Sequence, residues 1–304
     1  MKILNQHGFS QAWVLAAERY LSEYQRVGDI SVTALNDSPR IQELRRRHDD
    51  QITVDISDLM WLLLGQVMHK ILEESADPNA IAEQRILVPF DGWQISMKAD
   101  HIDPIPSKPG KYKICDYKIT QTWAWRHGVS KSQEAQNNLY AFGYGTKGID
   151  CPEGELEMFI KDFSAFEQKM KPRDYPAREV VRVPVQRWDI PKTEAYLRER
   201  IAIHKHARTC SDSDLPICTM DERWGSPDRF AVKCVTNEKI SDRACPGGAN
   251  FVSRTEAEAF VAKKGTGKQY VIEFRPGENK RCDRDACWVR RWCSTYNTII
   301  NPAF

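Results

Sequence analysis

Residues 93–120 read WQISMKADHIDPIPSKPGKYKICDYKIT, and the expected fold class follows from them. Polar and apolar side chains alternate over residues 93–102 and again over 111–120, which predicts two β-strands. The segment 103–110 between them holds three prolines and a glycine, which are typical of a turn. We therefore expect an antiparallel hairpin in this part of the chain.

Helical and extended patterns surround this hairpin. Apolar residues at helical spacing predict short helical segments that start at Ser31 and Ser38, and longer helices at 9–26, 57–74, 131–144 and 191–207. Alternating patterns predict further strands at 156–162, at 180–185 and at 81–90, where the turn Asp91-Gly92 follows. Because helices and strands follow one another along the chain, we expect an α/β fold with a central mixed sheet flanked by helices.

The last third of the chain has a different pattern. Two strand patterns, 229–235 and 268–274, enclose a helix at 256–264 that begins with the capping box Ser253-Arg-Thr-Glu256. This order predicts a small α+β module, which ends in a Cys- and Arg-rich stretch. We expect three regions, namely an N-terminal helical region 1–56, a core 57–210 and the small module 211–304.

The composition excludes several classes of protein. Lys and Arg number 44 and Asp and Glu 42, so a net charge of +2 gives no overall field toward nucleic acid or lipid. No apolar run reaches the length of about 18 residues that a membrane span needs, and the first residues lack the apolar core of a signal peptide. We expect a cytoplasmic protein without membrane contact, whose nine cysteines are thiols or metal ligands and not disulfides.

Two carboxylates and a lysine lie on neighbouring predicted strands. Asp100 lies near the end of one strand, and Asp116 and Lys118 project from one face of the next. Converging carboxylates repel each other unless a cation lies between them, and a hard divalent ion with oxygen ligands suits that position. Lys118 could then orient a water molecule or stabilise charge on a phosphate. Ordinary cross-strand ion pairs on a hairpin surface are the simpler alternative.

Two predicted helices carry further polar side chains at helical spacing. His69 follows Gly65 by four residues on the apolar helix 57–74, so both lie on one face. Gln136 and Tyr140 share a face of the helix after the strands in the same way. A hydrogen-bonded core histidine and a polar helix face are the plain alternatives for these two pairs.

Taken in order, these residues resemble the motifs of a known family. The motifs Gly65-xxx-His69, Asp100, Asp116-x-Lys118 and Gln136-xxx-Tyr140 resemble those of the PD-(D/E)XK nuclease superfamily, in its RecB-like branch. The resemblance implies a restriction-endonuclease-like core and hydrolysis of DNA with one or two Mg²⁺ or Mn²⁺ ions, as an exonuclease. A non-catalytic nucleic-acid-binding protein and a structure-specific endonuclease on the same fold are the alternatives.

The resemblance also implies roles for single residues. The metal ligands that it implies are His69, Asp100, Asp116 and the backbone carbonyl of Tyr117. It implies that Lys118 positions or activates the attacking water, and that Gln136 and Tyr140 hold the DNA backbone or the geometry of the site. Strand polarity, the preference for single or double strands, and oligomeric state stay open.

Aromatic and cationic side chains follow the strand that carries Lys118. They suit a path for a single strand whose bases stack and whose phosphates pair with cations, although core packing explains them equally well. The residues are Trp123, Trp125, Arg126, His127 and Lys131. The basic run Arg45-Arg46-Arg47-His48 is expected to be a solvated helix face, with contact to duplex phosphates as the alternative.

Three cysteines lie within twelve residues, a density that indicates metal ligation in an intracellular chain. They are Cys282, Cys287 and Cys293. We expect Cys218 as the fourth ligand, because it precedes the small module and would fasten that module at both ends. Cys210, Cys234 and Cys245 are rivals, although Cys234 lies in a predicted strand and fits a small buried apolar residue.

Four thiolates suit either a [4Fe–4S] cluster or Zn²⁺. The Cys-rich end resembles that of RecB-like nucleases with an iron–sulphur cluster, which favours the cluster. Those nucleases take their remaining cysteine from a Cys-Pro dipeptide, where this chain has Ser38-Pro39. The end of the chain also looks like phage-encoded nucleases, which implies a role in DNA recombination and a partner such as a single-strand annealing protein.

Overall fold

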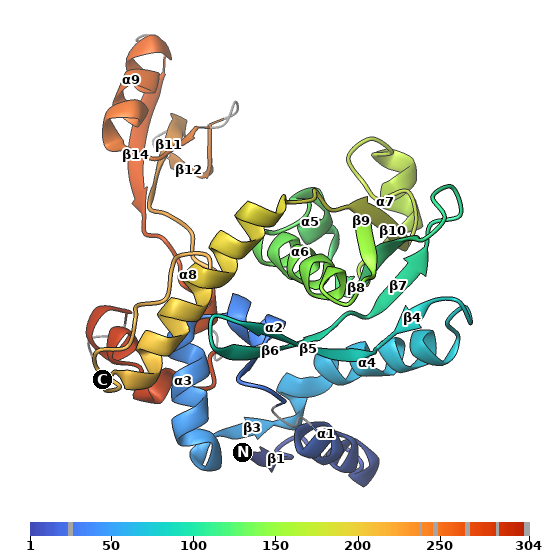
Figure 1. Cartoon of the computed structure of the whole chain (residues 1–304). Coiled ribbons are helices and arrows are strands. Elements are labelled where there is room, and N and C mark those ends of the chain that lie inside the picture. The colour runs from blue at the N-terminus through green and yellow to red at the C-terminus, as the bar shows by residue number, and fades with distance from the viewer. Residues whose placement is uncertain (24–26, 237–238, 246–248, 265–267, 284–285, 301–304) are drawn as a thin grey trace. The chain divides into compact units, whose positions relative to one another are not determined.

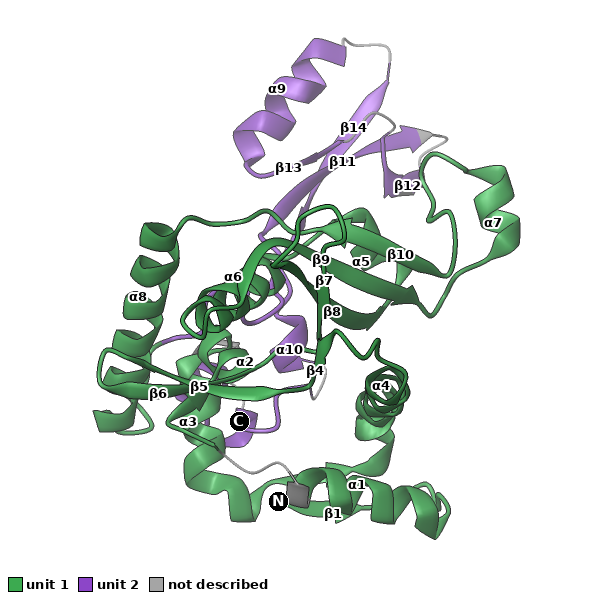
Figure 2. Ribbon diagram, turned by 45° about the vertical axis from the view of Figure 1, so that its right-hand side comes forward, with its two compact units in different colours: residues 1–216 green, residues 217–304 purple. Residues whose placement is uncertain are grey.

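The structure is a computed structural model in which residues 1–23, 27–236, 239–245, 249–264, 268–283 and 286–300 are described. The chain divides into two compact units, residues 1–216 and residues 217–304, which Figure 2 draws in different colours. Each unit has its own sheets and helices.

The helices of unit 1 include all four long helices that the sequence predicts. The α-helices are α1 (Gln11–Glu23), α2 (Val32–Asn36), α3 (Pro39–His48), α4 (Ile56–Glu74), α5 (Thr122–Arg126), α6 (Lys131–Gly145), α7 (Ala165–Met170) and α8 (Ile190–Thr209) (Figure 1). The part of the first predicted helix at 24–26 lies outside the described residues. Helices α5 and α7 are too short to show a period in the sequence.

Within the described residues, the strands of unit 1 form three sheets. The strands are β1 (Lys2–Leu4), β2 (Ile30–Ser31), β3 (Thr53–Asp55), β4 (Ile81–Ala82), β5 (Arg85–Phe90), β6 (Trp93–Lys98), β7 (His101–Pro104), β8 (Lys111–Thr120), β9 (Asp150–Ile160) and β10 (Val180–Pro184). The largest sheet has the order β10-β9-β8-β7-β4, in which β8 and β9 are parallel and the other pairs antiparallel. A second mixed sheet has the order β2-β6-β5, and β1 pairs with β3. The protein is therefore mixed α/β, as predicted, but its strands do not form a single sheet.

The predicted strands 81–90 and 93–102 are interrupted at 83–84 and at 99–100, which corrects the sequence expectation. The two segments pair as one long hairpin, yet β5 and β6 belong to the three-stranded sheet and β4 and β7 to the five-stranded sheet. At the break, the Glu83 amide donates a hydrogen bond to the Asp100 carbonyl at 3.2 Å, so pairing continues through the bend. The hairpin bend therefore places Glu83 beside Asp100 where the chain passes from one sheet to the other.

The closed end of this hairpin is the predicted turn. Asp91 and Gly92 have φ angles of 46° and 74°, and two positive φ values are what a tight two-residue hairpin turn requires. Helix α4 starts earlier than the sequence indicates. Its cap is Asp55, whose carboxylate accepts a hydrogen bond from the Ser57 amide at 3.0 Å, and not Ser57 or Asp58.

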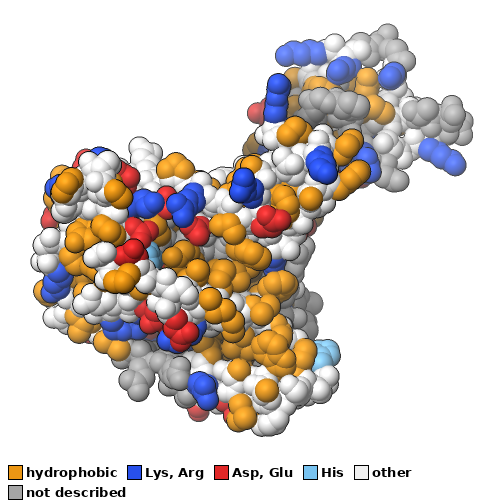
Figure 3. All heavy atoms as spheres, turned by 90° about the vertical axis from the view of Figure 1, so that its right-hand side faces the viewer, with side chains coloured by type: hydrophobic (Ala, Val, Ile, Leu, Met, Phe, Trp, Pro, Cys, Tyr) orange, Lys and Arg blue, Asp and Glu red, His pale blue; other side chains and the backbone are white. Residues whose placement is uncertain are grey.

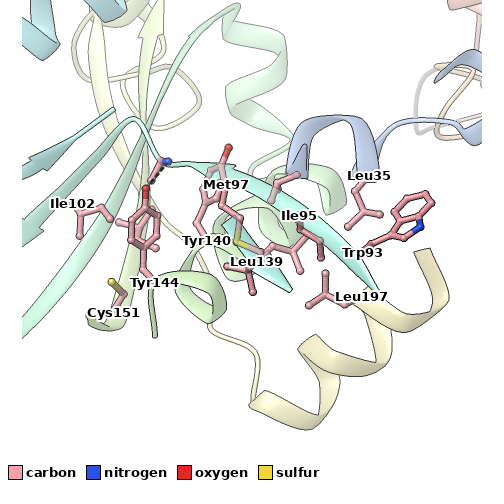
Figure 4. Close-up of a cluster of buried hydrophobic side chains, with 14 of the residues drawn as sticks. Leu35, Trp93, Ile95, Met97, Ile102, Leu139, Tyr140, Tyr144, Cys151 and Leu197 are labelled. Atoms are coloured by element: carbon pink, nitrogen blue, oxygen red, sulfur yellow. Dashed lines mark hydrogen bonds between the residues drawn. The ribbon is translucent and has the colours of Figure 1, made fainter. Parts of the chain in front are cut away.

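The main hydrophobic core lies between β6, α6 and α8 (Figure 4). Odd-numbered residues of β6 such as Met97 enter this core, which leaves the even-numbered side chains of the strand on the opposite face. Tyr144 of α6 is fully buried there. Its hydroxyl accepts a hydrogen bond from the Ala99 amide at 3.3 Å and donates one to the Gln84 carbonyl. Tyr144 thus bonds to both strands of the hairpin at its bend, at residues next to Asp100 and to Glu83.

Unit 2 contains the predicted small α+β module. Its elements are β11 (Arg229–Thr236), β12 (Lys239–Ala244), β13 (Asn250–Phe251), α9 (Arg254–Lys264) and β14 (Gln269–Arg275). β11 pairs with all three other strands, and apolar side chains of α9 pack on the sheet around Val232. The chain then forms α10 (Lys280–Asp283), a 3-10 turn (Arg290–Trp292) and a π-helical turn (Tyr296–Ile300).

One disulfide contradicts the expectation that every cysteine is a thiol or a ligand. Cys234 and Cys245 are bonded to each other, with their Cα atoms 5.9 Å apart. Cys234 lies in β11 and Cys245 directly follows the neighbouring strand β12, and antiparallel neighbours bring Cα atoms to the separation that a disulfide spans. Cys234 is therefore not a free buried thiol, and both residues cease to be rivals for the fourth metal ligand.

One face of the molecule exposes many apolar side chains. Figure 3 shows hydrophobic side chains gathered on the side toward which α4 ends, and on α4 itself Trp61, Val67 and Ile71 are each more than half exposed. None of the helices in the described ranges has the length and apolar character that crossing a membrane requires.

Candidate functional site

Three potential metal ligands converge at the hairpin bend. The nearest side-chain donor atoms of His69, Glu83 and Asp100 all lie within 4.8 Å of one another. His69 Nδ1 lies 3.5 Å from Glu83 Oε1 and 3.6 Å from Asp100 Oδ1. His69 comes from the middle of α4, and the two carboxylates come from the paired residues of the bend. We call these three residues the metal triad.

Glu83 is the member that the sequence analysis missed. It lies inside the segment 81–90, which the sequence predicts as a continuous strand. The alternation of polar and apolar residues there does not mark Glu83 as a site residue. Its φ of 51° is a left-handed conformation, which costs a non-glycine residue about 1–3 kcal/mol and is found preferentially at functional sites. The carboxylate also forms an ion pair with Lys98 Nζ. No signal in the sequence reveals a bend of this kind, because it depends on the change of sheet.

Asp116 and Lys118 project from the same face of β8, as predicted. Lys118 Nζ lies 2.5 Å from Asp116 Oδ2. Asp116 is 1% exposed, and neither of its carboxylate oxygens has a hydrogen bond of regular geometry. The Tyr117 amide between them donates to Asp100 Oδ2 at 2.8 Å, which fixes β8 beside the triad. The predicted trio of ligands is thus only partly assembled, because Glu83 and not Asp116 completes the convergent group.

The charges of the site influence one another strongly. Burial and the nearby charge of Asp116 raise the pKa of Asp100 to about 6. Burial alone would lower the pKa of His69, but the contact with Glu83 and the charge of Asp100 outweigh it and raise that pKa. The pKa of Lys118 is raised as well, since the two aspartates outweigh the effect of its burial. The acidic groups of the site therefore favour the positively charged forms of His69 and Lys118.

Gln136 and Tyr140 lie on one face of α6, as predicted, and bond to each other. Gln136 Nε2 donates to Tyr140 Oη at 3.0 Å. Tyr140 is 4% exposed, and burial raises the pKa of its hydroxyl, so the ring stays neutral. A further hydrogen bond to Thr33 joins Tyr140 to α2. Both Gln136 and Tyr140 line the same cavity as the metal triad.

This cavity has a volume of about 520 Å³ and lies within unit 1. β6 contributes Lys98, Ser96 and Trp93 to its wall beside Asp100, and core residues such as Tyr140 line it as well. Side chains of α1, α3, α4 and α8 line it as well, and Figures 1 and 2 draw α1, α3 and α4 on one side of β5 and β6. Its other cationic lining residues are Arg45, Arg46, Arg85 and Arg208.

The predicted aromatic path for DNA is only partly at the surface. Trp123 is 66% exposed, and its ring centre lies 4.2 Å from that of His127. Trp125 packs instead against the apolar cluster around Leu156, so the alternative of core packing holds for it. Arg126 donates to a backbone carbonyl, and Lys131 is exposed at the start of α6.

The basic run of α3 is not a simple solvated face. Arg46 and Arg47 both form ion pairs with Glu43, which is 4% exposed. Arg47 and His48 also contact Asp212 at 2.6 and 2.7 Å. These contacts join α3 to the chain that follows α8.

In unit 2, Cys218, Cys287 and Cys293 lie close enough to Cys282 for their charges to act on its thiol. Cys218, Cys282 and Cys287 are each less than a tenth exposed. Burial, and then the charges of Cys287, Cys218 and Cys293, raise the pKa of Cys282 to about 12. Thiols that disfavour one another's ionisation need a bound cation to exist together as thiolates. Cys210 belongs to unit 1, where its sulphur lies 3.4 Å from His206 Nε2.

The residues at the bend fit a hard divalent cation. One imidazole and two carboxylates converge, and a third carboxylate, that of Asp116, is buried beside them without regular hydrogen bonds. Oxygen donors with one imidazole suit Mg²⁺ or Mn²⁺ better than a soft metal. Lys98 now neutralises part of the charge at Glu83.

The chain was compared with protein families, curated proteins and solved structures. Neither a scan against models of protein families nor a search of curated proteins finds a match. Among solved structures, the chain is similar to the crystal structure of SSO0001 at 17% identity and a TM-score of 0.43, over 63% of this chain and 84% of that one. A likeness at this level carries no argument about function.

Proposed function

We propose that this protein is a divalent-cation-dependent nuclease that hydrolyses phosphodiester bonds in DNA. The observation that carries the proposal is the metal triad, three ligating side chains within 4.8 Å beside the buried pair Asp116 and Lys118. Buried acidic groups in contact with one another are costly, and a bound cation removes that cost. The order of the motifs, which resembles that of RecB-like nucleases, supports DNA as the substrate.

In this proposal His69, Glu83 and Asp100 would hold the cation, and Asp116 would supply a further oxygen. When bound, such a cation neutralises the phosphate and activates water for attack. Lys118 stays charged at neutral pH, because its pKa is raised, and its ion pair with Asp116 holds the ammonium group beside the ligands, where it would stabilise charge on the attacked phosphate. The hydrogen bond between Gln136 and Tyr140 keeps the Gln136 amide oriented toward the cavity and the DNA backbone.

A single strand is the substrate in this proposal. Trp123, which is 66% exposed beside His127, offers an aromatic surface on which an unpaired base can stack, and this supports that choice. A strand that enters the site by its end would be degraded as an exonuclease degrades it.

We further propose that Cys218, Cys282, Cys287 and Cys293 hold a [4Fe–4S] cluster, with Zn²⁺ as the alternative. Four thiols within reach of one another's charge support this proposal, and both groups take four thiolates. The ligands would fasten the start of unit 2 to its end, where backbone contacts already join the Ser226 amide to the Glu278 carbonyl at 2.9 Å. This site would be structural.

The test of the nuclease is digestion of end-labelled single-stranded, double-stranded and circular DNA in Mg²⁺ or Mn²⁺. We expect cation-dependent loss of linear single strands, and at least a 100-fold lower rate for Asp116→Ala. Asp150→Ala, which removes an exposed aspartate of β9, is the matched control and should keep the wild-type rate. Wild-type protein that binds DNA without cleaving it in either cation would make the protein a binding module, and equal rates for both variants would refute the assigned site.

A further inference from the structure

Two cations lie one step along the hairpin from the two carboxylates of the metal triad. Arg85 and Lys98 are partners in the β5–β6 ladder, two residues beyond Glu83 and Asp100. Arg85 begins β5 and Lys98 ends β6, so this pair closes the ladder next to the bend that holds the two carboxylates. All four side chains line the same cavity, so two positive groups follow directly on two negative groups along its wall.

These two cations differ in what they contact. Lys98 Nζ forms an ion pair with the Glu83 carboxylate of the triad. Arg85 Nη1 donates to the neutral Ser96 hydroxyl at 2.6 Å. The side chain of Glu83 is 11% exposed and that of Lys98 is 41% exposed, so the lysine is the partner with room to move. Of these two cations, only Lys98 therefore competes with a metal ion for a ligand of the triad.

A divalent cation in the triad would change the position of Lys98. The cation repels the ammonium group and attracts the Glu83 oxygens more strongly than a single charge does. The lysine head is a point charge on a flexible stem of four carbons, so it can leave the carboxylate without a change in the backbone. A lysine that leaves Glu83 would still lie beside the cation site on the cavity wall, where a phosphate next to the attacked one could take the place of the carboxylate.

We propose that Lys98 is a positioning residue that exchanges the Glu83 carboxylate for a DNA phosphate when the divalent cation binds. Arg85 bonds to a neutral hydroxyl and not to a carboxylate of the triad, so it binds phosphate whether or not the cation is present. This inference rests on the proposed nuclease function and adds a regulation of the same site. Because coupling between two ligands is reciprocal, cation and DNA then bind cooperatively through Lys98.

The first test measures cation binding without DNA, by isothermal titration calorimetry with Ca²⁺. Lys98→Met removes the competitor for Glu83, so its Ca²⁺ affinity should rise at least fivefold above that of the wild type. Arg85→Met removes an equal charge at the same step of the hairpin and is the matched control, with a change of at most about twofold. Lys98→Gln should behave as Lys98→Met does, which separates the loss of charge from the packing of the new side chain.

The second test measures DNA binding by fluorescence anisotropy of an internally labelled oligothymidylate of twenty nucleotides. Titrations in EDTA and in Ca²⁺ are compared, and a gel checks that the oligonucleotide stays intact. Wild-type affinity should be about tenfold higher in Ca²⁺. Lys98→Met should lower this ratio at least threefold, whereas Arg85→Met should weaken binding in both conditions and keep the ratio.

Equal Ca²⁺ affinities for Lys98→Met and the wild type would overturn the exchange, and so would an unchanged DNA-binding ratio in Lys98→Met. Equal effects of the Arg85 and Lys98 substitutions on both quantities would also overturn it, since they would reveal a general effect of charge. The calorimetric test uses no DNA and no turnover. It therefore decides the exchange at Glu83 even if digestion assays refute the nuclease function.

Discussion

Tyr144→Phe removes a single buried oxygen that bonds to both strands of the hairpin at its bend. The hydroxyl accepts from the Ala99 amide at 3.3 Å and donates to the Gln84 carbonyl, and Ala99 is 1% exposed. A buried donor left without a partner costs about 1–3 kcal/mol, so the free energy of unfolding should fall by that amount. Because these backbone groups adjoin Glu83 and Asp100, the two carboxylates should also be held less firmly. Removing a group that holds metal ligands in place typically lowers metal affinity about 10–100-fold. We expect a loss at the lower end of this range, about tenfold, for Tyr144→Phe.

Urea unfolding and Mn²⁺ titration calorimetry measure these two effects separately. Tyr196→Phe is the matched control, since it removes another tyrosine hydroxyl that packs against the core, one that donates a hydrogen bond to Asn36 Oδ1 at 3.0 Å. It should lower stability by a similar amount and leave Mn²⁺ affinity within twofold of the wild type. If Tyr144→Phe loses stability while its Mn²⁺ affinity equals that of Tyr196→Phe, the argument that Tyr144 positions the triad is wrong.

Three further changes have definite expected outcomes. Cys287→Ser should lose the bound metal and destabilise unit 2, whereas Cys210→Ser should retain both; elemental analysis that finds neither iron nor zinc in the wild type would contradict this. Burial and the charge of Arg200 lower the pKa of His204 to about 4, below about 6.5 for an unfolded chain, so the unfolded state binds more protons between these values. The free energy of unfolding should therefore fall by up to about 3 kcal/mol as pH drops from about 6.5 to 4, and urea titrations of His204→Gln should show a flatter dependence. Gly143→Ala would place a Cβ 2.0 Å from Met97 Sδ and 3.3 Å from Val88 Cγ2 in the core, so it should cost about 1–3 kcal/mol in thermal unfolding, and an unchanged melting temperature would count against this packing.

The sequence was sufficient where local patterns determine the outcome. The helices α4 and α6 follow from apolar spacing, and the turn at Asp91-Gly92 follows from the residues that tolerate positive φ. The shared faces of Asp116 with Lys118, and of Gln136 with Tyr140, follow from the periods of strand and helix. The closeness of His69 to Asp100 also agrees with the order of the motifs.

Only the tertiary structure decided how the hairpin bends and what meets there. Glu83 enters the metal triad because the backbone passes from one sheet to another at that residue. The alternation of polar and apolar residues does not mark this passage, since it continues on both sides of Glu83. The disulfide between Cys234 and Cys245 likewise depends on how two strands pair. Periodicity reports which side of an element a residue occupies, since that is set by the backbone of the element itself. Which distant element lies on that side is set by packing and pairing over many residues, and no local pattern in the sequence records it.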